Sequence, residues 1–138
     1  MVVTRTIKVE SKKELDIVNI TDKVQDAVGK SGAKTGIVTV FVPGATGAIT
    51  AIEYENGLLK DFADGLKRIA PEGINYEHHK KWDDDNGRSH VKASLIGPGM
   101  TVPFKDKKLM LGTWQQIVFV ELDTRPRTRE IILQILGE

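Results

Sequence analysis

All three histidines of this chain lie in one short polar stretch. His78, His79 and His90 fall within thirteen residues, together with Glu77 and the acidic run at 83–85. Imidazole and carboxylate groups together can ligate a divalent metal or transfer protons. A solvated loop of mixed charge fits the same spacing, so the histidines alone do not decide between a site and a surface loop.

Carboxylates elsewhere in the chain offer partners for such a site. Glu53 and Glu55 stand two residues apart, and in a strand such residues point to the same face. Asp61 borders the apolar stripe of a predicted helix, so we expect it to be partly buried. A buried carboxylate needs a cation or hydrogen-bond donors, which a structural ion pair provides as well as a site does.

A third cluster is the run Gly112-Thr113-Trp114-Gln115. We expect Trp114 to be largely buried at the start of a strand, where a large aromatic side chain adds to a core. We expect Gln115 to point into a pocket and hydrogen-bond a ligand. The residue types alone also allow Gln115 to bond a backbone edge.

The periodicity of apolar residues predicts the elements that position these clusters. Alternation or β-branched composition predicts extended segments at 3–9, 15–20, 35–42, 48–52, 100–104, 115–122 and 130–136. Helical spacing predicts helices at 21–29, 55–70 and 89–96, of which 55–70 is the clearest. The polar residues 71–88 are predicted to form a functional loop. Strands joined by short turns favour antiparallel pairing.

The amino-acid composition limits the classes of protein to which this chain can belong. The 138 residues are 40% hydrophobic and 28% charged with a formal net charge of +1, as expected for one domain spanning 1–138. This balance argues against nucleic acid or an anionic membrane as partner. The absence of cysteine excludes disulfides, thiolate metal sites and a cysteine nucleophile. No apolar run reaches the roughly 20 residues of a membrane span, so we expect a cytoplasmic protein.

Several runs together resemble the signature of the YjbQ family. They are Asn75-Tyr76-Glu77-His78, Asp85-Asn86, SHVKASLIG at 89–97, Val102-Pro103 and LGTWQQI at 111–117. The resemblance implies an α+β sandwich of mainly antiparallel strands flanked by helices, assembled as a homotrimer. In such a ring, residues of neighbouring subunits can share a site.

The resemblance also implies an activity, weak thiamine-phosphate synthesis. That reaction joins hydroxymethylpyrimidine diphosphate to thiazole phosphate and releases pyrophosphate, usually with help from a divalent metal such as Zn, Mg or Mn. His78 and His90 would bind the metal or phosphate. The implied catalytic residues are Glu53, Asp61 and Gln115, and the implied contacts to a phosphorylated substrate are Lys92, Thr113, Trp114 and Arg129.

One departure from the family pattern leaves two functions open. Many relatives carry a histidine-threonine pair where this chain has Gly44-Ala45. The first interpretation is a metal-assisted transferase, and the alternative is a non-catalytic trimer that binds a phosphorylated metabolite or a metal. For either we predict that His78 and His90 converge with Glu53 or Asp61, whereas His79 is exposed and dispensable.

Overall fold

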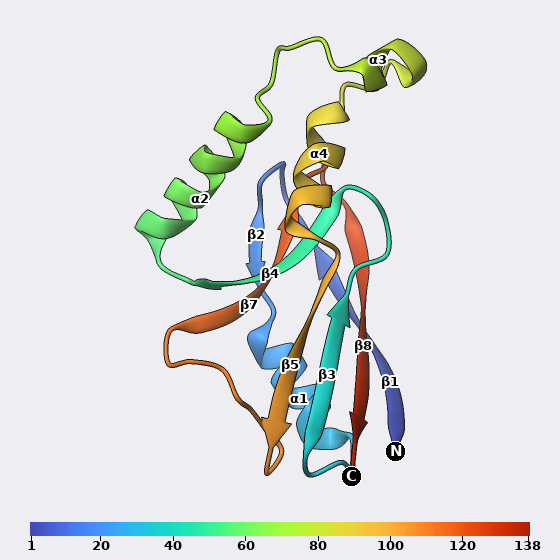
Figure 1. Ribbon diagram of the computed structural model, residues 1–138, viewed down its shortest axis with the longest axis vertical. Helices are drawn as coiled ribbons and strands as arrows, with labels where there is room; N and C mark the ends of the chain where they lie inside the picture. The colour runs from blue at the N-terminus through green and yellow to red at the C-terminus, as the bar shows by residue number, and fades with distance from the viewer.

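The computed structural model describes all 138 residues, which form eight strands and four helices with every strand pair antiparallel (Figure 1). The strands are β1 (Val2–Glu10), β2 (Ile17–Asn19), β3 (Gly36–Phe41), β4 (Gly47–Glu53), β5 (Gly99–Lys105), β6 (Lys108–Leu109), β7 (Gln115–Glu121) and β8 (Thr128–Gly137). The helices are α1 (Thr21–Lys30), α2 (Asn56–Ile69), α3 (Glu77–Trp82) and α4 (Gly87–Ile96). The predicted α+β class is therefore confirmed.

Two sheets pack against each other. The larger has the strand order β1-β8-β3-β5-β6, and the smaller has the order β2-β7-β4. Alternate residues of β3 and β8 point inward, among them Val38, Val40 and Leu133. They meet Phe119 of the smaller sheet and Val24 of α1 in the main core. The period-2 pattern of these strands thus places one apolar face of each sheet inside.

Helices α2 and α4 cover the other face of the smaller sheet and build a second core. Leu66 of α2 and Ala93 of α4 pack there with Ala48 of β4 and Val118 and Val120 of β7. Glu55 caps the N-terminus of α2, because its carboxylate accepts hydrogen bonds from the backbone N–H groups of the first turn. This second layer holds α4, which carries His90 and Lys92, at one end of the sandwich (Figure 1).

The region predicted as a loop, 71–88, is the main difference from the predicted elements. It contains helix α3, and α4 begins at Gly87 rather than at 89. Strand β6 is also absent from the predicted elements, because a two-residue strand carries no periodic signal. None of the four helices is long and apolar enough to cross a membrane.

Candidate functional site

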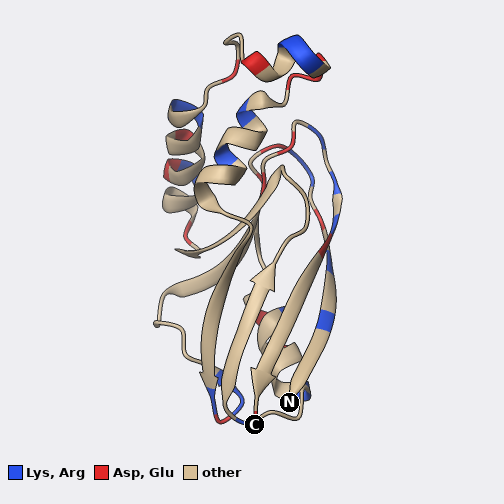
Figure 2. Ribbon diagram, turned by 45° about the vertical axis from the view of Figure 1, so that its right-hand side comes forward, with Lys and Arg blue, Asp and Glu red and all other residues tan.

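A basic cavity of about 480 Å³ lies between α2, α4 and the β1–β2 connection. The basic residues of the two helices stand on neighbouring elements at one end of the molecule (Figure 2). The charged residues that line this cavity are Lys13, Glu14, Lys67, Glu72, Arg88 and Lys92. Its volume is typical of a site for a small molecule.

Arg88 forms one wall of this basic cavity and is tied to the β1–β2 connection. Its guanidinium donates two hydrogen bonds of 2.9 Å to the two carboxylate oxygens of Glu14. It also pairs with Asp85 at 3.3 Å. The hydrogen bonds to Glu14 raise the pKa of Arg88, so it is a permanent cation held in a fixed orientation.

Lys92 lies one helical turn beyond Arg88 and is the most unusual charged residue of the chain. Only 1% of its surface is exposed, yet its amino group makes no hydrogen bond or ion pair, and the residue lines the basic cavity. Burial lowers its pKa, because the charged form loses hydration, and the attraction of the nearby carboxylates of Glu14 and Glu72 only partly offsets this loss. The resemblance pointed to Lys92 as a substrate contact, and its place in the cavity fits that prediction.

The histidine pair lies on a different side of α4 from Lys92. His90 and Lys92 are two residues apart, which places them about 200° apart around the helix. The ring centroids of His78 and His90 are 4.6 Å apart, so these two histidines converge as predicted. His78 Nδ1 lies 3.1 Å from Asp84, and His90 Nδ1 lies 3.0 Å from the carbonyl oxygen of Ala45.

The donors at the histidine pair do not form a metal site within one chain. Nowhere does the chain gather three His, Cys, Asp or Glu side chains in a group that could hold a metal ion. Gly44 lies beside His90 in a smaller pocket of about 240 Å³ and supplies no donor. Its φ of +114° favours glycine and lets this turn lie against the guanidinium of Arg129.

The predicted exposure of His79 is wrong. This histidine is half-buried rather than exposed, with its Nε2 3.1 Å from a carboxylate oxygen of Asp85. The extended loop assumed for this stretch would have pointed neighbouring side chains in opposite directions. Helix α3 instead turns both histidines toward the acidic segment that follows it.

The carboxylates predicted to join the histidines lie elsewhere. Glu53 ends β4 and lines a separate pocket with Thr113 and Trp114. Asp61 is exposed on α2, so its predicted partial burial is wrong. The predicted convergence of the histidines with Glu53 or Asp61 is therefore wrong within one chain, and Asp84 takes that place.

The GTWQ run also differs from its prediction. Trp114 is 73% exposed, because it precedes β7 on a turn that projects from the smaller sheet. Gln115 accepts a hydrogen bond from the backbone N–H of Gly112 at 3.1 Å, so its amide oxygen stabilises the turn that precedes β7. The prediction that Gln115 points into a pocket is wrong, and Gln116 lines the pocket instead.

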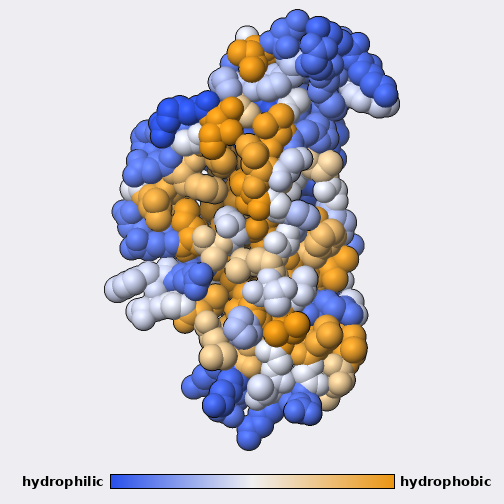
Figure 3. Space-filling model, viewed as in Figure 1, coloured by the Kyte–Doolittle hydropathy of each residue, from blue (hydrophilic) through white to orange (hydrophobic).

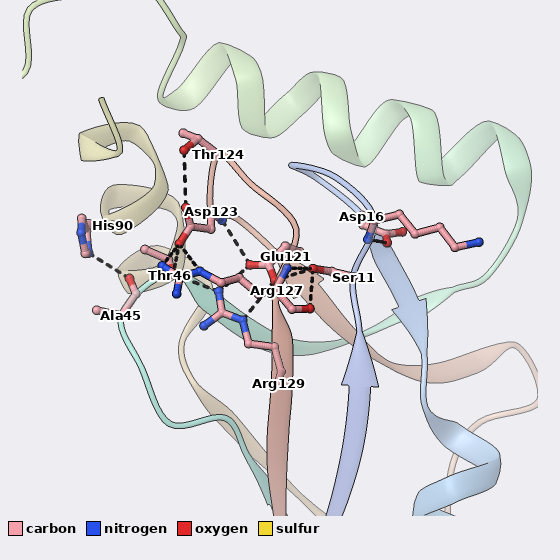
Figure 4. A network of polar contacts seen from close by, with 11 residues as sticks. Ser11, Asp16, Ala45, Thr46, His90, Glu121, Asp123, Thr124, Arg127 and Arg129 are labelled. Carbon is pink, nitrogen blue, oxygen red and sulfur yellow. Dashed lines mark hydrogen bonds and ion pairs between the residues drawn. The ribbon is translucent and has the colours of Figure 1, made fainter. Parts of the chain in front are cut away.

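Arg129, a predicted substrate contact, is engaged inside the protein (Figure 4). Its guanidinium donates to both carboxylate oxygens of the fully buried Glu121 and to Thr46 Oγ1 at 2.9 Å. Neighbouring Asp123 accepts from Arg127 and Thr46. Burial raises the pKa of Asp123, but these hydrogen bonds outweigh it and hold the pKa below its ordinary value.

Sequence reasoning missed most of the basic cavity. The residues that it did not single out are Lys13, Glu14, Lys67, Glu72 and Arg88. One signal was available, because Arg88 and Lys92 are four residues apart and share one face of a helix. Lys13 and Lys67 are brought there only by the packing of the β1–β2 connection against α2, which no local pattern reports.

The comparisons with known proteins agree over the whole chain. A model of the family described as UPF0047 protein YjbQ-like matches residues 5–138. A UPF0047 protein of Archaeoglobus fulgidus is 38% identical over 130 residues, covering 94% of this chain and 98% of that protein. The crystal structure of a YbjQ-like protein of unknown function from Sulfolobus solfataricus is 38% identical with a TM-score of 0.95, covering 100% and 99% of the two chains. A hypothetical protein from Aeropyrum pernix is 32% identical with a TM-score of 0.92, covering 99% of each chain. This chain belongs to the UPF0047 YjbQ-like family.

Proposed function

We propose that this protein binds a small phosphorylated metabolite in the basic cavity. The observation that carries the proposal is the gathering of Lys13, Lys67, Arg88 and Lys92 around one cavity of about 480 Å³. Phosphate groups are recognised by fixed guanidinium donors and by the point charge of lysine. The formal net charge of the whole chain is only +1, so this concentration of cations is local.

The charges within the basic cavity support an anion rather than a neutral ligand. Of its two carboxylates, Glu14 is occupied by Arg88. Lys13 and Lys67 make no ion pair, and both are exposed at the cavity, where they are free to turn toward a ligand.

Calorimetric titration with inorganic phosphate and inorganic pyrophosphate tests this function. We expect Lys67→Gln to weaken binding about tenfold, since a hydrogen bond to a charged group is lost. Lys108→Gln is the matched control, because Lys108 is exposed in the β5–β6 hairpin and lines no cavity. Binding should also weaken as salt increases. Equal affinity in all three proteins would disprove the proposed site.

Thiamine-phosphate synthesis is the second candidate function. It is favoured by the convergence of His78 and His90 at 4.6 Å and by the phosphate groups that both of its substrates carry. The donors of one chain do not fit a metal ion, so a further donor would have to come from a neighbouring copy in the expected trimer. The basic cavity would then hold a phosphate of one substrate.

Single alanine variants of the three histidines test this second candidate. Turnover of hydroxymethylpyrimidine diphosphate with thiazole phosphate, and metal content, are measured with Zn, Mg or Mn supplied. We expect His78→Ala and His90→Ala to lose both properties, whereas His79→Ala retains them. Equal tolerance of all three substitutions rules out a role for the histidine pair.

A further inference from the structure

We propose that Lys92 forms a reversible imine with a small aldehyde or ketone that carries an anionic group and binds in the basic cavity. This inference rests on the proposed function, since the cationic wall supplies the affinity for the anionic group. It adds a covalent step and names the ligand class, an anionic carbonyl compound. It does not involve the histidine pair, which lies on another side of α4.

The surroundings of Lys92 are those of a nucleophilic amine. The side chain is 1% exposed, lines the cavity, and has no carboxylate or carbonyl oxygen within hydrogen-bond distance of its amino group. The cations Arg88 and Lys67 line the same cavity and oppose a further positive charge on Lys92. Burial and these two cations favour the neutral amine, the form whose lone pair attacks a carbonyl carbon, and together they outweigh the carboxylates of Glu14 and Glu72, which favour the charged form.

The other groups of the cavity match the remaining needs of the reaction. Lys13, Lys67 and Arg88 provide cations for a phosphate or carboxylate group of the ligand. Glu72 lines the cavity and makes no ion pair, so its carboxylate is free to move protons. The nearest alternative nucleophile on the buried face of α4 is Ser89, one turn before Lys92. Its hydroxyl is fully buried without a partner, but Ser89 lines no cavity and cannot meet a ligand.

The reaction needs no oxidant or co-reactant. The nitrogen of Lys92 bonds to the carbonyl carbon, the carbonyl π electrons move to oxygen, and a proton passes from nitrogen to that oxygen. The C–O bond of the resulting carbinolamine then breaks, and the carboxylate of Glu72 accepts the second nitrogen proton and delivers it to the departing hydroxyl group, which leaves as water. Amine and carbonyl compound thus become imine and water, and hydrolysis reverses the sequence.

Reductive trapping tests the inference on the intact protein. Glycolaldehyde phosphate and uncharged glycolaldehyde are each added with sodium cyanoborohydride at neutral pH, which converts an imine into a stable secondary amine. The modified lysines are then located by mass spectrometry of peptides. We expect the phosphorylated aldehyde to label Lys92 about tenfold more efficiently than glycolaldehyde, as one charge-assisted hydrogen bond would provide. Excess inorganic phosphate should suppress the label.

Three variants make the outcome decisive. Lys92→Met removes the amine without leaving a polar group buried, so it should fold and lose the label at this position. Lys67→Gln should reduce labelling of Lys92, whereas Lys108→Gln should leave it unchanged. Label spread over exposed lysines with no enrichment at Lys92 would overturn the imine. Calorimetry with inorganic phosphate, run beside the trapping, tells this failure apart from failure of the proposed function, because phosphate can bind without any adduct.

Discussion

At the scale of single residues, the structure places an uncompensated lysine inside the protein. Lys92 is almost fully buried and unpaired, whereas the neighbouring Arg88 is held by Glu14 and Asp85. Removing the amino group of Lys92 from water costs free energy of folding, which the nearby carboxylates of Glu14 and Glu72 only partly offset. A residue retained at such a cost is typical of a functional site.

The first prediction follows from that cost. Lys92→Met should raise the free energy of unfolding at neutral pH by about 1–3 kcal/mol, since it removes an amino group that loses hydration on folding and makes no hydrogen bond. Because burial lowers the pKa of Lys92 in the folded state, the unfolded chain binds more protons between that lowered pKa and the ordinary lysine pKa, and wild-type stability rises with pH across this interval. The gain from Lys92→Met should therefore shrink as pH approaches the ordinary lysine pKa of about 10.4.

Urea unfolding of both proteins across pH measures this difference. Lys108→Met serves as control, because Lys108 is exposed and its charge is hydrated in both states. A destabilised Lys92→Met variant would show that the folded protein satisfies this amine after all.

The second prediction concerns Trp114. Its 73% exposure replaces the burial predicted from sequence, so truncation leaves no cavity. We expect Trp114→Ala to change the free energy of unfolding by less than about 0.5 kcal/mol, as surface substitutions usually do. In contrast, Phe119→Ala in the main core should cost about 3–5 kcal/mol. A large loss in Trp114→Ala, seen by the same unfolding assay, would mean that another copy covers this side chain.

At the scale of elements, a buried ion pair joins β7, β8 and the turn before β4. Arg129 of β8 donates to Glu121 of β7 and to Thr46. Ser11, which follows β1, donates to the same Glu121 carboxylate at 2.7 Å. These hydrogen bonds link one end of the larger sheet to the smaller sheet. They occupy the guanidinium of Arg129, which is therefore not available to a ligand.

The third prediction tests that structural role. Arg129→Ala should destabilise the protein by about 3–5 kcal/mol, because it leaves the carboxylate of Glu121 buried and unpaired. Thermal unfolding measures the loss, with the exposed Arg125→Ala as control. Phosphate affinity of the folded Arg129→Ala protein should match wild type. Unchanged stability together with lost phosphate binding would return Arg129 to the role of a substrate contact.

At the scale of the whole molecule, apolar side chains gather on the surface. Figure 3 shows them between α2 and α4 and on the sheet below. On the larger sheet, Ile37 and Phe41 of β3 and Leu136 of β8 point outward and are about 40% exposed. An exposed apolar sheet face of this kind is typical of a protein–protein contact.

The fourth prediction is the homotrimer that the family resemblance implies. Sedimentation equilibrium should give the mass of three chains at micromolar concentration. Phe41→Lys should shift the protein toward the monomer, because it places a charge on the apolar face, whereas Lys108→Gln should not. A wild-type monomer would leave the outer face of the larger sheet without the expected partner and would remove the shared site of the second candidate function.

Most of the fold was open to prediction from sequence. The β-branched, apolar composition of β3, β7 and β8 and the helical spacing in α2 identified those elements to within two residues, because both are local properties of one element. Short elements escaped prediction. Helix α3 is six residues long and β6 two, so neither contains enough residues to show a period.

The candidate site, like the fold, was predictable from sequence only in part. From the sequence, His78 and His90 were predicted to meet, since they lie only twelve positions apart in a segment that can fold back on itself, and their rings do lie together. Only the tertiary structure decided that Glu53 and Asp61 lie apart from them, that Arg129 is bound by Glu121, and that Trp114 is exposed. The physical reason is that a residue's type records the chemistry it can do, whereas its burial and its partners depend on elements distant in the chain. Lys92 is the clearest case, because its amine is buried without a hydrogen bond only where α4, α2 and the β1–β2 connection come together.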